Sequence, residues 1–149
     1  MLRIATFRNI QINVWTDAPD VHQLRAFARK SQQFCQSWYP RNTALLNATL
    51  RGRPHFSEGV RDELVKVMRM RGVFRLGTAH LITVSGLPGS AARAFLSTGI
   101  LIARPKTPTK VFGVPKITCD WLEERAAAQG DYWTSADLLV AYYEAISGR

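Results

Sequence analysis

The sequence contains few cysteines, and their spacing is not typical of a metal site. The two cysteines, Cys35 and Cys119, lie far apart and have no metal-ligand spacing with the three histidines. We therefore expect no disulfide, no metal and no cofactor, and we interpret the cysteines as small core residues of a cytoplasmic protein.

The sequence also lacks a long apolar run. Its longest apolar stretch, residues 91–103, contains Arg93 and falls short of the roughly 20 apolar residues that a membrane-spanning helix needs. We predict a buried helix there instead. Met1 is not followed by an apolar run with a small-residue cleavage site, so no export signal is visible. Repeats and low-complexity segments are missing as well, which favours one globular, cytoplasmic domain.

The pattern of polar and apolar residues predicts that strands and helices alternate. Residues 3–15 alternate with a turn at Arg8-Asn9, which indicates a β-hairpin. Helical periodicity, capping residues and prolines then predict the remaining elements. These are helices over residues 21–38, from 57 to about 72, after 90 as far as 105, 115–130 and from 135 onward, and strands over 43–50, 80–85 and 110–113. The predicted fold is α/β, with a mixed central sheet, βαβ crossovers and helices packed on it.

Positive charge is in excess. There are 20 Lys and Arg against 11 Asp and Glu, a formal net charge of +9. On the second helix, Lys66 and Arg69 fall on the polar side opposite the apolar stripe, and Arg61 lies at the edge of that polar side. Arg51, Arg53, Arg71 and Arg75 lie on or beside that helix. This pattern predicts a docking face for an acidic protein or for a phosphate backbone, and the alternative is an ordinary solvated helix face.

Aromatic residues near the C-terminus are candidates for a second contact surface. Trp133, Tyr142 and Tyr143 lie in or just before the last predicted helix. They could contact another protein or a second copy of this chain, and burial in the core is the alternative.

Two segments have the composition of anion sites. Ser57 is a plausible helix N-cap whose phosphorylation would place a phosphate at a helix N-terminus. The turn from Gly86 to Ser90, with Gly89, Ser90 and then Arg93, could hold an anion close to the backbone. The alternatives without a bound anion are an ordinary helix cap at Ser57 and a tight turn between a strand and a helix at residues 86–90.

The order of elements, the strand ending in Ser85-Gly86, the helix of residues 91–94 and the strand of residues 110–113 resemble the STAS-like proteins, relatives of the sporulation anti-sigma-factor antagonist. The resemblance is to a mostly uncharacterised bacterial branch and covers about residues 1–125, which leaves residues 126–149 as a C-terminal helical extension. It implies a non-enzymatic module that binds partner proteins, with Ser57 at the position of the phosphorylated serine. The Asp-x-Ser-Gly pattern of such sites is absent here.

No nucleophile-and-base spacing is present, so we do not expect an enzyme. The sequence predicts a bacterial adaptor or regulatory module that binds a partner protein, with the basic helical face as its contact surface. The alternative is a nucleic-acid-binding protein without sequence preference, which would use the same charge.

Overall fold

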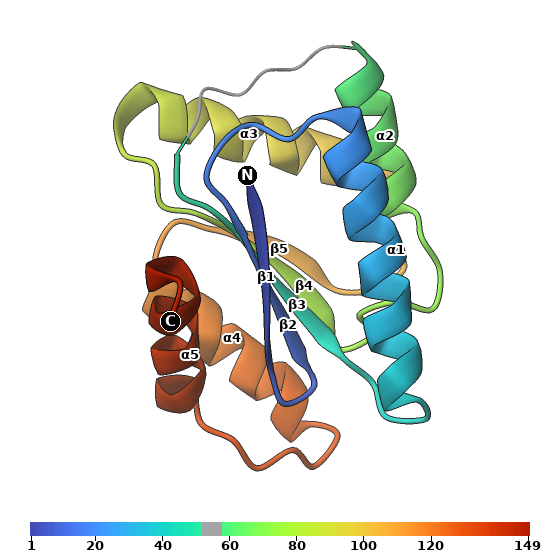
Figure 1. The fold of residues 1–149 in the computed structure, drawn as a ribbon, viewed down its shortest axis with the longest axis vertical. Coiled ribbons are helices and arrows are strands. Elements are labelled where there is room, and N and C mark those ends of the chain that lie inside the picture. The colour runs from blue at the N-terminus through green and yellow to red at the C-terminus, as the bar shows by residue number, and fades with distance from the viewer. Residues whose placement is uncertain (52–57) are drawn as a thin grey trace.

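The computed structural model describes residues 1–51 and 58–149, and within them the chain forms five strands and five helices (Figure 1). Their order matches the predicted one. The strands are β1 (Leu2–Phe7), β2 (Ile10–Trp15), β3 (Ala44–Thr49), β4 (Gly77–Ile82) and β5 (Thr109–Phe112). The helices are α1 (Val21–Trp38), α2 (Glu58–Met68), α3 (Gly86–Ala103), α4 (Pro115–Ala127) and α5 (Ser135–Ser147).

The strands form one mixed sheet in the order β1-β2-β3-β4-β5. β1 and β2 are antiparallel and joined by the two-residue turn at Arg8-Asn9, where Arg8 has a φ of 49°. β2, β3, β4 and β5 run parallel to one another. The prediction of an α/β fold with a mixed sheet and an N-terminal hairpin is therefore confirmed.

Local capping explains why two helices begin where the sequence predicts. The Asp20 carboxylate accepts a hydrogen bond from the Gln23 backbone N–H at 2.7 Å, and the Gln23 side chain accepts one from the Asp20 N–H at 3.1 Å. Thr134 and Asp137 form the same reciprocal cap before α5. Each such box satisfies two N–H groups that the helix leaves without a partner.

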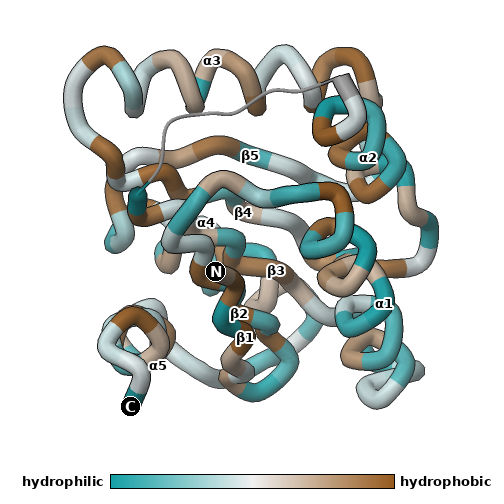
Figure 2. Tube along the Cα trace, turned by 45° about the horizontal axis from the view of Figure 1, so that its top comes forward, coloured by the Kyte–Doolittle hydropathy of each residue, from teal (hydrophilic) through white to brown (hydrophobic). Residues whose placement is uncertain are grey.

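The helices cover the sheet from both sides (Figure 2). Consecutive parallel strands lie side by side, so right-handed crossovers place α1, α2 and α3 on one face. α4 and α5 cover the other face, where α5 packs on β1 and β2. The larger core cluster lies under α4 and α5, where Ile12, Leu46, Leu122 and Leu138 are fully buried. The C-terminal helix, which the resemblance sets apart as an extension, thus completes this core.

Several predicted boundaries differ from the structure; β4 ends at Ile82 and not at Ser85, and α4 ends at Ala127 and not near Gly130. α2 ends at Met68 and not near Gly72, and β4 begins three residues earlier than predicted. Parallel pairing aligns Ala44 with Gly77 and Thr49 with Ile82, so β3 decides where β4 lies. Residues 86–90 are the first turn of α3 and not a loop. Ser85, which has extended φ and ψ, is the N-cap residue, so the helix begins directly after it at Gly86.

The prediction that the apolar helix is buried is wrong. Within α3 only Gly89 and Ala103 are buried, whereas Leu87 and Leu101 are 86% and 76% exposed. α3 lies at the edge of the sheet beside β5, so the described chain covers only its inner side. Among the described residues, none of the helices combines the length and apolar character that crossing a membrane requires.

Candidate functional site

A shared carboxylate joins the basic residues of α1 and α2. Arg25 Nε on α1 lies 3.4 Å from Glu63 Oε2 on α2, and Lys66 Nζ lies 3.9 Å from the same oxygen. The Glu63 side chain is only 12% exposed. One nearly buried acid therefore lies between two exposed cations, which leaves net positive charge at the junction of the helices.

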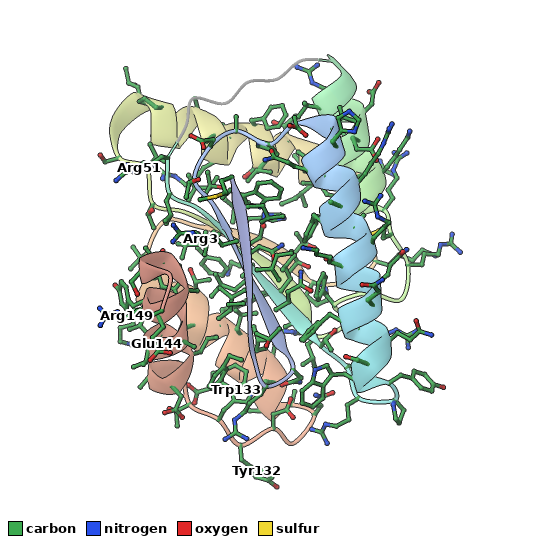
Figure 3. All side chains as sticks on the ribbon, viewed as in Figure 1. Arg3, Arg51, Tyr132, Trp133, Glu144 and Arg149 are labelled. Carbon is green, nitrogen blue, oxygen red and sulfur yellow. The ribbon has the colours of Figure 1, made fainter. Side chains whose placement is uncertain are left out.

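Further cations extend this positive surface. Arg29 follows Arg25 by one helical turn and is exposed. Arg71, just beyond α2, lines a shallow depression together with Gln32 and Gln36 of α1. We call Arg25, Arg29, Lys66 and Arg71 the cationic face. Arg69 is also exposed, but its Nη2 donates to the Ile102 carbonyl oxygen of α3 at 3.4 Å. Figure 3 shows long side chains with blue nitrogen tips projecting from α1 and α2 into solvent.

The remaining predicted basic residues lie elsewhere. The Arg61 guanidinium is 5.9 Å from the centroid of the Phe95 ring, on the side of α2 that faces α3. Arg51 lies at the end of β3, at the left of Figure 3, whereas α2 lies at the right. The N-terminal ammonium lowers the pKa of Asp17, and Arg51 adds to that effect. Arg53 and Ser57 lie outside the described residues.

The predicted aromatic surface separates into core and exposed residues. Trp133 and Tyr142 are 5% and 1% exposed and belong to the core under α4 and α5, so core burial, the alternative interpretation, describes both. Burial raises the pKa of Tyr142 to about 12. Tyr143 is 55% exposed, but it lies on the face of the sheet away from α1 and α2.

In the segment of residues 86–93, which was predicted to hold an anion, the Arg93 guanidinium instead donates hydrogen bonds to backbone carbonyls. Arg93 Nη1 donates to the carbonyl oxygens of Ile82 at 3.1 Å and Val84 at 3.4 Å, and Nη2 lies 3.4 Å from Ser90 Oγ. Gly89 is buried against Val84, where a side chain would overlap the carbonyl group. Arg93 and Gly89 thus join the start of α3 to the end of β4.

A cavity of about 140 Å³ lies between the sheet and helices α1, α2 and α3. Its wall is mostly apolar and comes from strands and all three helices. Among the residues that line it are Trp15, Leu24, Phe27, Val67, Met68 and Phe95.

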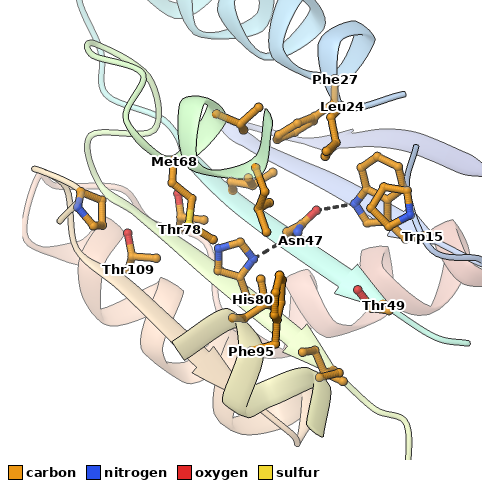
Figure 4. Close-up of a pocket in the computed structure, with 18 of the residues that line it drawn as sticks. Trp15, Leu24, Phe27, Asn47, Thr49, Met68, Thr78, His80, Phe95 and Thr109 are labelled. Carbon is orange, nitrogen blue, oxygen red and sulfur yellow. Dashed lines mark hydrogen bonds between the residues drawn. The ribbon is translucent and has the colours of Figure 1, made fainter. Parts of the chain in front are cut away.

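A row of polar side chains crosses the sheet at this cavity. Parallel pairing aligns Asn13 with Asn47 and Asn47 with His80, on three neighbouring strands. Trp15 Nε1 donates to Asn47 Oδ1 at 2.8 Å, and Asn47 Nδ2 lies 3.1 Å from His80 Nδ1 (Figure 4). We call Asn13, Asn47 and His80 the polar row.

The indole determines the protonation of the histidine. An indole N–H can only donate, so the oxygen of Asn47 faces Trp15 and its NH₂ group faces His80. His80 Nδ1 therefore accepts, and the ring proton resides on Nε2. Burial lowers the pKa of His80 to about 4, which keeps the ring neutral near pH 7.

Sequence reasoning missed this site, although a signal was present. Asn47 and His80 are polar residues within mostly apolar strands. Side chains two residues apart in a strand lie on the same face, so each of them shares its face of the sheet with apolar neighbours such as Leu45 and Ile82. Polar residues at such positions in buried strands indicate either a hydrogen-bonded network or a cavity.

No group of three or more His, Cys, Asp or Glu side chains could hold a metal ion in the part of the chain that the structure describes. No protein-family model matches the sequence, and no curated protein matches it.

Proposed function

We infer that the protein is a non-enzymatic regulatory module that binds an acidic partner protein through the cationic face. The observation that carries this proposal is the concentration of exposed cations on two packed helices, with Glu63 enclosed between Arg25 and Lys66. Arg29 and Arg71 have no ion-pair partner among residues 1–51 and 58–149, so their charge is available to a ligand.

The local chemistry favours a protein over a nucleic acid. Asp62 is exposed on α2 beside the cations and would repel a phosphate backbone. Phe27 and Phe74, beneath this surface, are buried, and Tyr39, which lines the depression with Arg71, is 81% exposed. Tyr39 is one stacking platform, whereas proteins that bind single strands stack successive bases on several aromatic side chains. A partner that carries both acidic and basic side chains fits this mixture of charges better. The resemblance to STAS-like modules, which bind proteins, agrees with this function and stays a prediction.

Reversing two charges on this face should weaken partner binding. We expect Arg29→Glu combined with Arg71→Glu to weaken affinity for the partner about tenfold or more, because each change converts an attraction into a repulsion. The partner is identified by affinity capture from nuclease-treated lysate, then purified and titrated against each variant at several salt concentrations.

A matched control has the same net charge. Lys110→Glu combined with Arg149→Glu changes two exposed cations on β5 and at the C-terminus, away from the cationic face, and should leave affinity within about twofold. Equal losses in both double variants would show that only net charge matters and would contradict the proposal. Loss of all binding after nuclease treatment would assign the face to nucleic acid instead.

A further inference from the structure

The cavity under α1–α3 has the size of a small-molecule site. Its volume of about 140 Å³ is similar to that of an engineered apolar cavity of about 150 Å³ that binds benzene. One aromatic ring or a short acyl chain would therefore fill it. The wall is built from side chains such as Leu24, Val67, Met68 and Phe95, which favour apolar atoms.

One donor at the sheet side of the cavity has no hydrogen bond among the described residues. The Nε2–H group of His80 has no partner among the described residues, and His80 lines the cavity. Asn13, in the same polar row, is 0% exposed and does not line the cavity; its Nδ2 atom has no hydrogen-bond partner among residues 1–51 and 58–149. A donor that lines an apolar cavity costs free energy unless it is hydrogen-bonded, so the Nε2–H group of His80 favours an acceptor inside the cavity.

The polar row is oriented for a hydrogen-bond acceptor. Trp15 orients Asn47, and Asn47 orients the imidazole so that its one free donor, as far as the described residues show, is Nε2–H (Figure 4). Among the described residues that line the cavity, Arg51 is the one that carries a fixed charge near pH 7, and Arg51 is exposed. A ligand that carried a charge deep in this cavity would lose its hydration without gaining a partner.

We propose that this cavity binds a small, neutral, mostly apolar molecule, an aromatic ring or a short acyl chain, whose carbonyl oxygen accepts a hydrogen bond from His80 Nε2. The site lies beneath α1 and α2, whereas the cationic face lies on their outer side, so this inference goes beyond the proposed function. The two sites can be tested independently because Arg29→Glu with Arg71→Glu should leave the cavity unchanged.

A pair of isosteric probes tests the hydrogen bond. Acetophenone carries a carbonyl group where α-methylstyrene carries a CH₂ group of the same shape. We expect the ratio of acetophenone affinity to α-methylstyrene affinity to be about tenfold higher in the wild-type protein than in His80→Leu, since only the ketone oxygen can accept from His80 and the ketone loses its hydration in both proteins. Binding is followed by NMR of side-chain methyl groups, where Leu24, Val67 and Met68 should shift and Leu122 and Leu138 on the other face should not.

Variants in one helix test the location. Ala92 lines the cavity and Ala94, two residues along α3, is exposed. Ala92→Phe should fill the cavity and abolish binding of both probes, whereas Ala94→Phe should leave binding unchanged. His80→Leu should lower the ratio of acetophenone affinity to α-methylstyrene affinity while α-methylstyrene still binds.

Several results would overturn the proposal. Failure of both probes to shift the lining methyl groups in the wild-type protein would mean that the cavity is only a packing void. An affinity ratio that is the same in the wild-type protein and in His80→Leu would mean that His80 contributes no hydrogen bond. If His80→Leu does not fold, the NMR signal of the His80 Nε2–H group in the wild-type protein decides the question, because acetophenone should shift it downfield and α-methylstyrene should not.

Discussion

Replacing Gly89 with alanine is expected to reduce the free energy of unfolding by about 3 kcal/mol, a large loss for one methyl group. A Cβ at this position would lie 2.7 Å from the carbonyl carbon of Val84 and closer still to its oxygen. Both of these atoms belong to the backbone and cannot rotate away. The first turn of α3 would have to move off β4, and Arg93 would lose its hydrogen bonds to the carbonyls of Ile82 and Val84.

The same helix provides the control for this prediction. At Gly99 the added Cβ would meet Met68 Cε at 3.7 Å, an ordinary contact with a flexible side chain. Gly99→Ala should therefore stabilise the protein by about 0.5–1 kcal/mol, because alanine loses less conformational entropy in a helix. Urea denaturation of both variants measures the two effects. Similar small effects at both positions would show that α3 does not pack on β4 as described.

Acidification is expected to destabilise the protein through His80. The folded state lowers the pKa of this histidine from 6.5 to about 4 by burying it, so below about pH 6.5 the unfolded chain binds a proton that the folded protein excludes. Stability from this group is complete above pH 6.5 and is lost as the pH falls toward 4. The expected loss between pH 7 and pH 4 is about 3 kcal/mol.

Comparison of variants isolates this effect from the titration of carboxylates. Urea denaturation of the wild-type protein and of His80→Leu at pH 7, 5.5 and 4.5 gives the slope of stability against pH. The variant should be less stable at pH 7 but should lose less stability on acidification. His22 is exposed, so His22→Gln should keep the wild-type slope. A wild-type slope in His80→Leu would show that the imidazole is not buried in its neutral form.

Local signals predicted the elements that depend on nearby residues. Asp20 and Gln23 cap α1 within one turn, and the predicted bounds of that helix are those of the structure. Thr134 and Asp137 do the same for α5. The β1–β2 hairpin followed from its alternation and its two-residue turn. In each case the deciding hydrogen bonds join residues close in sequence.

Pairing between distant segments decided what the sequence pattern could not. The bounds of β4 depend on its parallel pairing with β3, which begins at Gly77, so the predicted start at His80 was three residues late. Periodicity showed that α3 is apolar but not that the helix lies at the edge of the sheet, with its outer side uncovered. Trp133 and Tyr142 became core residues because α4 and α5 enclose them with β1 and β2.

The candidate sites divide in the same way. The excess of basic residues on α2 could be read from helical periodicity, but their junction with α1 depends on the contact between Arg25 and Glu63. Asn13, Asn47 and His80 are separated by more than thirty positions in the chain, and only parallel register places them in one row.

The sequence by itself determined the order of strands and helices, the mixed sheet and the positive charge, because these depend on local hydrogen bonding, side-chain periodicity and composition. The tertiary structure alone decided which aromatic residues are buried, which cations gather on one surface and where a cavity remains. Those outcomes depend on the packing of segments far apart in the chain, and no local pattern encodes the distance between them.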